Sequence, residues 1–165
     1  MKKGTSVIVR GLQSKPQLNG KTGTIDSYIP AKDRYSVKIT GEEGSKNLKP
    51  DNLVQQVPFL TLHNVSKTEL NGKSGKIVGW TEDSSRYHVS LTSVGVSGQA
   101  VALQGKNLTY PAGTIVRMHS LKGGAQHNGK WGVVMSFDSS AGRHIVKLDQ
   151  SGNTQLRIKP DNIAV

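Results

Sequence analysis

Hydrophobic and polar side chains alternate along short stretches of the chain, and this alternation predicts β-strands. The clearest stretch is residues 34–39, where Tyr35, Val37 and Ile39 alternate with polar side chains. A half-buried antiparallel strand has this period of two, because one of its faces lies on the core and the other in solvent. No window places apolar residues at the spacings of three and four that an amphipathic helix requires, so we expect little helix.

The same pattern returns three times, each time around an Asn-Gly pair at Asn19, Asn71 and Asn128. The letters at the three anchors are LNGKTG, LNGKSG and HNGKWG. Counted from each Asn, a Gly follows at +4, a β-branched aliphatic residue at +6, an aromatic residue at +9 and an Arg at +15. Recurrence at fixed spacings indicates one structural unit repeated within the chain.

The residues at these four positions are Gly23, Gly75 and Gly132; Ile25, Ile77 and Val134; Tyr28, Trp80 and Phe137; and Arg34, Arg86 and Arg143. Each repeat also starts with an alternating apolar pair and closes on an Asn, within LKPDNL, LQGKNL or IKPDNI. We therefore predict repeats over residues 1–56, 57–110 and 111–165. Their short, Pro-containing connections, VQQVP and TYPAG, favour a closely packed array over flexibly linked domains.

Within a repeat, the pattern predicts four or five strands of four to seven residues each. The polar segments IPAKDR, TEDSSR and DSSAGR predict a hairpin connection at the same place in all three repeats. An all-β chain of three tandem small SH3-like barrels fits these features best. A β-trefoil is the alternative, in which three such units share one core.

The segment VIVRGLQSKPQLNGKTGTIDSY resembles the KOW motif of ribosomal proteins and transcription-elongation factors. The matching positions are Val7, Val9, Gly20, Lys21, Gly23 and Ile25, then Leu60, Leu62, Gly72, Lys73, Gly75 and Ile77, then Val116, Met118, Gly129, Lys130, Gly132 and Val134. The resemblance implies an SH3-like barrel in each repeat. The longer form of the pattern is also similar to tandem repeats of algal and protist proteins, which points to a versatile module.

Charge and composition narrow the class of partner. The formal net charge is +11, and a field of that sign attracts polyanions such as nucleic acid or acidic protein surfaces. The three repeats carry ten, five and seven Lys and Arg against five, three and three Asp and Glu, so the outer two are the most basic. The chain has no Cys, no apolar leader after its first Lys residues and no membrane-spanning run, so we expect an intracellular protein, cytoplasmic or nuclear, without a membrane partner.

No enzyme signature is present, and we expect no catalysis, no cofactor, no metal and no small-molecule substrate. The stretches NGKTG and NGKSG lack the upstream Gly and following helix of a nucleotide-binding P-loop. The five His residues do not stand at metal-ligand spacing. His144 occupies the position of Tyr35 and Tyr87 and is expected to pack at a half-buried site.

The Asn and both Gly of each anchor are expected to shape a turn, because both residue types tolerate positive φ and Asn-Gly is a strong hairpin signal. The Gly at +4 suits a bulge or a close backbone approach. The turn does not need the cation that follows it, so the three Lys at this position, Lys21, Lys73 and Lys130, are candidate phosphate contacts.

Other candidate contacts surround these turns. The Arg at +15 either pair with nearby acids such as Asp33 or form an exposed basic ridge, and Lys38 and Lys147 lie on the outer face of the strand that follows. Trp131 has three interpretations: it stacks on a base, anchors in a protein pocket, or packs on a neighbouring repeat. The aromatic residues at +9 are either rim residues of the core or a ligand cage.

These observations support two functions. The first is a non-catalytic protein that binds nucleic acid, RNA or ribonucleoprotein above all, through backbone phosphates, because no recognition helix for a DNA major groove is expected. Its site residues would be Lys21, Lys73, Lys130, Arg34, Arg86, Arg143, Trp131, Lys38 and Lys147. The alternative is a protein-interaction or scaffold subunit of a large assembly, with an acidic protein partner.

Overall fold

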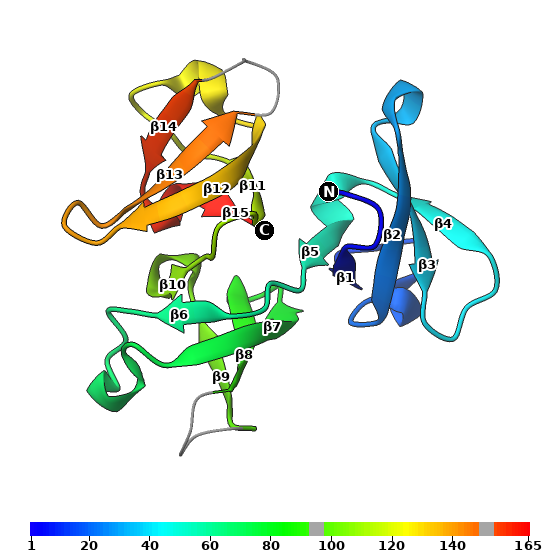
Figure 1. Ribbon diagram of the computed structural model, residues 1–165. Helices are drawn as coiled ribbons and strands as arrows, with labels where there is room; N and C mark the ends of the chain where they lie inside the picture. The colour runs from blue at the N-terminus through cyan, green and yellow to red at the C-terminus, as the bar shows by residue number, and fades with distance from the viewer. Residues whose placement is uncertain (93–97, 149–153) are drawn as a thin grey trace. The chain divides into compact units, whose positions relative to one another are not determined.

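The protein is built from three five-stranded antiparallel sheets that follow one another along the chain (Figure 1). This computed structural model describes residues 1–92, 98–148 and 154–165. In these ranges the regular elements are β-strands and single 3-10 turns, without an α-helix. The prediction of an all-β chain with three tandem modules is confirmed, since each repeat pairs its own five strands. Closure of each sheet into a barrel stays a prediction.

The first sheet has the strand order β4-β3-β2-β1-β5. Its strands are β1 (Ser6–Val9), β2 (Thr22–Ile29), β3 (Arg34–Ile39), β4 (Ser45–Leu48) and β5 (Leu53–Gln55). Short 3-10 turns precede β2, β3 and β5: Pro16–Leu18, Pro30–Lys32 and Pro50–Asn52. Each of these turns begins with Pro, whose fixed φ suits the first position of a 3-10 or helical turn.

The second and third sheets have the orders β10-β6-β7-β8-β9 and β14-β13-β12-β11-β15. The strands of the second are β6 (Leu60–Leu62), β7 (Ser74–Thr81), β8 (Arg86–Leu91), β9 (Ala100–Leu103) and β10 (Leu108–Thr109). The strands of the third are β11 (Ile115–Met118), β12 (Trp131–Asp138), β13 (Arg143–Leu148), β14 (Gln155–Ile158) and β15 (Ile163–Ala164). The expected strand length of four to seven residues is wrong at both extremes, since β12 has eight residues and β15 has two.

The chain divides into two compact units, Met1–Gln56 with Ile77–His88, and Val57–Lys76 with Val89–Val165. The first sheet lies in the first unit and the third sheet in the second, while the middle sheet has strands in both. The repeat boundaries predicted after residues 56 and 110 fall in the connections between one sheet and the next.

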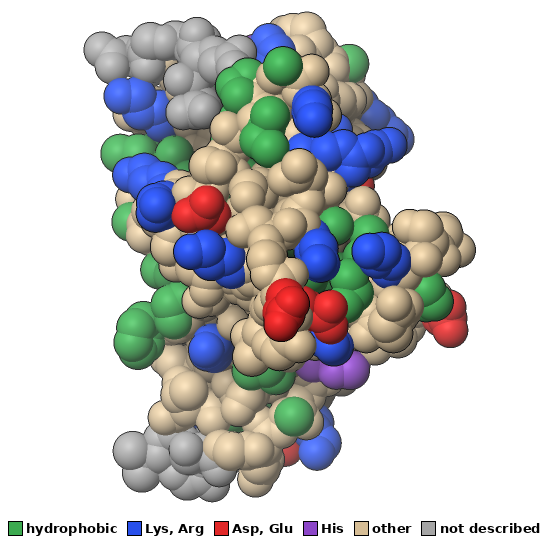
Figure 2. Space-filling model, turned by 90° about the vertical axis from the view of Figure 1, so that its right-hand side faces the viewer, with side chains coloured by type: hydrophobic (Ala, Val, Ile, Leu, Met, Phe, Trp, Pro, Cys, Tyr) green, Lys and Arg blue, Asp and Glu red, His purple; other side chains and the backbone are tan. Residues whose placement is uncertain are grey.

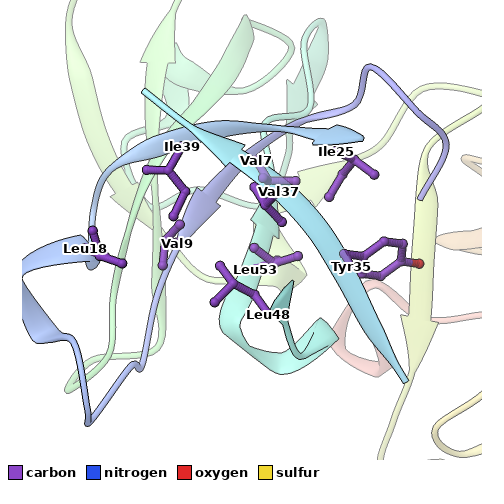
Figure 3. Close-up of a cluster of buried hydrophobic side chains, with 9 residues drawn as sticks. All are labelled: Val7, Val9, Leu18, Ile25, Tyr35, Val37, Ile39, Leu48 and Leu53. Atoms are coloured by element: carbon purple, nitrogen blue, oxygen red, sulfur yellow. The ribbon is translucent and has the colours of Figure 1, made fainter. Parts of the chain in front are cut away.

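The core of the first repeat forms as the alternation predicts. Tyr35, Val37 and Ile39 on β3 are buried, whereas the alternate residues of that strand face outward. Figure 3 shows the side chains that they meet: Val7, Val9, Leu18, Ile25, Leu48 and Leu53. These come from all the other strands of the sheet and from the 3-10 turn before β2, so one small core holds the whole repeat together.

The Gly at +4 allows two strands to approach closely. A Cβ built at Gly132 would lie 2.5 Å from Val146 Cγ1 and 2.8 Å from the carbonyl oxygen of Lys147, closer than atoms can pack. Gly23 and Gly75 are equally crowded by the strand beside them. The Gly at +4 was expected to form either a β-bulge or a close backbone approach, and the structure shows the close approach. The irregularity in the β12–β13 pairing lies further on, between Val134 and Ser136.

His144 takes the place of Tyr35 and Tyr87 in the core of the third repeat. Its ring is fully buried, so its expected packing role is confirmed but its expected partial exposure is wrong. The backbone N–H of Tyr110 donates to Nε2 of His144 at 2.9 Å, which requires that nitrogen to be unprotonated. Burial, with a smaller effect of His63, lowers the pKa of His144 to about 4.

We expect Gly132→Ala to lower the free energy of unfolding by about 1–3 kcal/mol, the usual cost of overpacking a filled core. Gly123→Ala in the same repeat is the matched control, because no atom lies within 4 Å of the added Cβ and the backbone φ is not positive there. Urea denaturation of both variants measures the difference. Equal stability of the two variants would contradict the close approach.

We expect acid to destabilise the protein through His144. Its pKa is about 4 when folded and 6.5 when unfolded, so between these values only the unfolded chain binds the proton. The free energy of unfolding therefore falls as the pH drops from 6.5 to 4, by roughly 3 kcal/mol in total. His144→Tyr, which installs the residue of the other repeats, should remove most of this slope, whereas His88→Gln at an exposed site should retain it. Identical slopes in wild type and His144→Tyr would refute this assignment.

Candidate nucleic-acid interface

The Asn-Gly pair of each repeat lies in a tight turn that presents the following Lys. Asn19 has φ −62° and ψ 136°, Gly20 has φ 83°, and the N–H of Lys21 donates to the carbonyl of Leu18 at 3.1 Å. This is type II geometry, in which only the Gly needs a positive φ. A turn at this place is confirmed, but it is not the hairpin turn with positive φ at both residues.

The Asn is required by its side chain and not by its backbone. One residue of the preceding loop pairs with this amide in both directions: its backbone N–H donates to the Asn Oδ1, and its carbonyl oxygen accepts from the Asn Nδ2. The pairs are Asn19 with Leu12, Asn71 with Val65 and Asn128 with Leu121, at 2.8–3.2 Å. Only an amide supplies a donor and an acceptor in this arrangement, so the Asn holds the loop on the turn.

The three Lys after the turn have different surroundings. Lys21 Nζ lies 2.6 Å from Glu42 Oε1, and this hydrogen bond lowers the pKa of the Glu42 carboxyl. Lys73 is half-buried and Lys130 is exposed. The three Lys have the same local sequence context, but Lys21 is held by an acid of its own repeat, whereas Lys130 is exposed.

In the first and third repeats, the Arg at +15 links two strands of the sheet from its outer side. Arg34 Nη1 donates to the carbonyl of Asn47 at 3.2 Å, and Arg143 Nη1 donates to the carbonyl of Arg157 at 3.2 Å. These bonds link the start of the third strand to the fourth and leave further guanidinium donors. Asp33, which we considered as a partner of Arg34, accepts a hydrogen bond from the Tyr28 hydroxyl at 2.7 Å. Arg86 opens β8 at a half-buried position.

Trp131 lies at the start of β12 and is half-buried. It stands directly opposite Arg117 in the β11–β12 pair, and two residues further along β12, Val133 stands opposite Lys147 of β13. Val116 and Val134, on the other face, are buried, so Trp131, Arg117 and Lys147 share the outward face of the sheet. Directly opposite residues have Cβ atoms about 5 Å apart and diagonal ones are about 7–8 Å apart, so Arg117 and Lys147 extend from positions next to Trp131. The Nε of Arg117 donates to the carbonyl oxygen of Gly129 at 3.2 Å.

Arg117 is a residue that sequence reasoning missed. Its position between the buried Val116 and Met118 predicts an outward side chain, but only the strand register places it opposite Trp131. In the first repeat, the same outward face carries Lys38 on β3, exposed and opposite Thr24 and Ser45. The outward face of the third repeat is therefore the place where an aromatic ring and several cations come together.

The surface carries more basic than acidic side chains, as Figure 2 shows for one face. Several cations pair with acids in the described ranges: Lys3 with Asp26 at 3.2 Å, Arg157 with Asp138 at 3.5 Å, and Lys21 with Glu42. Exposed pairs such as Lys3–Asp26 contribute little to stability. Because 22 Lys and Arg stand against 11 Asp and Glu, the formal net charge of +11 remains even when every acid is paired.

Among residues 1–92, 98–148 and 154–165, no group of His, Asp and Glu is arranged to hold a metal ion. In the same ranges, none of the helical elements is long and apolar enough to cross a membrane. No protein-family model matches the chain, and no curated protein is significantly similar to it. The candidate interface is therefore defined only by the positions of its own residues.

We expect Asn128→Ala to lower the free energy of unfolding by about 1–2 kcal/mol, because the variant cannot form the two hydrogen bonds to Leu121 and leaves the backbone groups of that residue without their partner. Hydrogen exchange at the N–H of Leu121 should accelerate in the variant. Asn47→Ala, at an exposed position of β4, is the composition-matched control. Unchanged exchange at Leu121 would show that the side chain does not hold the loop.

Proposed function

We propose that the protein binds single-stranded nucleic acid, RNA in particular, through the outward face of its third repeat, and that it acts by binding and not by catalysis. The observation that carries this proposal is the position of Trp131 beside Arg117, with Lys147 diagonal to it and the exposed Lys130 directly before it. The proposal includes a KOW-type module in each repeat, which the recurring turn and five-stranded sheet support.

An aromatic ring among cations suits a single strand better than a duplex. Unpaired bases stack on aromatic side chains, while Lys and Arg contact the phosphates between them. In a duplex the bases already stack on one another, and reading a DNA major groove commonly uses an inserted helix or β-ribbon. The regular elements in the described ranges are short strands and 3-10 turns, and the ring lies on a sheet face.

Other basic side chains are further candidate phosphate contacts, which specify no sequence. Lys38 in the first repeat and Arg143 in the third lie on outward faces, and Lys73 follows the turn of the second. Phosphate contacts of this kind release counterions, so affinity falls steeply as salt rises. We therefore expect modest sequence preference and a strong dependence on ionic strength.

The test is fluorescence anisotropy with a labelled, mixed-sequence single-stranded RNA over a range of salt concentrations. Trp131→Ala should weaken binding by roughly tenfold or more with little change in salt dependence, because stacking contributes about 1–3 kcal/mol per base. Trp131→Phe should recover part of that loss. Single-stranded DNA and duplex RNA of the same length are the comparison ligands, and the duplex should bind more weakly.

A charge-reversal pair separates the Lys residues. Lys130→Glu should reduce the slope of log affinity against log salt, by about 0.7 for each phosphate of a single strand that the variant no longer neutralises. Lys21→Glu is the matched control at the equivalent position of the first repeat and should have less effect, because Lys21 already pairs with Glu42. Binding that stays millimolar at low salt, or is insensitive to both Trp131→Ala and Lys130→Glu, would overturn the proposal and favour a protein partner.

A further inference from the structure

Each repeat carries two rings in tilted or edge-on contact at the same place, one nine residues after the anchor Asn, on the second strand, and one sixteen residues after it, on the third. We call them the rim pair. The three rim pairs are Tyr28 with Tyr35, Trp80 with Tyr87, and Phe137 with His144, with ring centroids 4.8–4.9 Å apart. The ring at +9 is the outer member of the pair, since the ring at +16 is buried in the core.

In the second and third repeats, a side chain from the preceding repeat lies against this outer ring. The guanidinium carbon of Arg10 is 4.7 Å from the ring centroid of Trp80, and the rings of His63 and Phe137 are 5.6 Å apart. Arg10 and Trp80 belong to one compact unit, and His63 and Phe137 belong to the other. The same contact therefore occurs twice along the chain, each time from one repeat to the next.

Arg10 and His63 occupy the same structural position, and His119 is its third copy. Each follows the first strand of its repeat and exchanges two hydrogen bonds with the closing Asn: its N–H donates to the Asn carbonyl, and the Asn amide donates to its carbonyl. The pairs are Arg10 with Asn52, His63 with Asn107, and His119 with Asn162, at 2.9–3.3 Å. The backbone of His119 is therefore held in the same way as that of Arg10 and His63.

The side chains that meet between repeats are less exposed than their counterparts that have no such contact within the described residues of the chain. Arg10, His63, Trp80 and Phe137 are half-buried where they meet. His119 is exposed, and so is Tyr28, with 45% of its surface accessible. Within residues 1–165, the first repeat therefore presents an accessible outer ring, and the third presents the complementary side chain.

We propose that the third repeat of one copy docks on the first repeat of a second copy, with His119 lying over the ring of Tyr28. An acidic side chain lies beside the outer ring in both the observed contact of Trp80 and the proposed contact of Tyr28. Trp80 Nε1 donates to the carboxylate of Glu82, which also pairs with Arg10 at 3.6 Å. The hydroxyl of Tyr28 donates in the same way to Asp33, whose carboxylate then faces the incoming imidazole.

This contact joins two different surfaces, so it is heterologous and leaves an identical pair of surfaces open on the product. Such an association grows into longer assemblies unless the geometry closes it into a ring. The proposal does not depend on nucleic-acid binding, because neither Tyr28 nor His119 is among the proposed nucleic-acid contacts.

The test is sedimentation velocity of the full chain without nucleic acid, over a range of protein concentrations. Wild type should form species larger than the monomer as concentration rises. Tyr28→Ala and His119→Ala should each weaken association by roughly tenfold, the effect expected for removing a cation or ring stacked on an aromatic group. Phe59→Ala, which removes a more exposed ring elsewhere (78% accessible), is the matched control and should leave association unchanged.

Mixing the two variants gives the decisive result. Tyr28→Ala retains an intact His119 surface and His119→Ala retains an intact Tyr28 surface, so an equimolar mixture should form a dimer and nothing larger. His119→Arg, which copies Arg10, should retain association. A wild type that stays monomeric at all concentrations, a mixture that fails to dimerise, or an equal loss in Phe59→Ala would overturn the proposal.

Discussion

The backbone of the Asn-Gly turn is hydrogen-bonded in both directions to the first strand of its own repeat, and the rest of each sheet follows from this contact. In the first repeat, the N–H of Gly20 donates to the carbonyl of Val9 at 2.7 Å, and the N–H of Val9 donates to the carbonyl of Lys21 at 2.9 Å. The second strand must then start at Thr22, which places Gly23 opposite Val7. A slip by one residue would turn every core side chain toward solvent.

Much of this architecture was predictable because it depends on local pattern. Period-two alternation identified the strands, and recurrence identified three units. The crowding at Gly132 explains why no side chain appears at +4, a requirement that spacing alone left open between a bulge and a close approach. The shape of the turn was misjudged at Asn19, because the reason for an Asn there is a pair of side-chain hydrogen bonds to Leu12, and such a bond across a loop leaves no periodic signal.

The candidate site was less predictable because it depends on register and on contacts between distant residues. Trp131 stands where the other repeats have Thr22 and Ser74, and this difference is visible in the sequence. Its neighbour Arg117 is fourteen positions earlier and is brought opposite it by strand pairing. Lys21 and Lys130 have the same local sequence context, yet Glu42 approaches only the first. The stacking of Arg10 on Trp80 likewise joins residues of two repeats. Charge and composition indicate the class of ligand, whereas the structure determines which cations are positioned for it.

The first and last strands of every repeat are paired with each other, β1 with β5, β6 with β10 and β11 with β15. The chain therefore enters and leaves each sheet at adjacent positions, and the ends of a repeat lie side by side. A segment with this property can be duplicated or deleted as a whole without breaking the strand pairing of its neighbours. Evolution or design can thus change the number of modules in such an array, and with it the avidity for a long polymeric ligand, while the surface of each module stays the same.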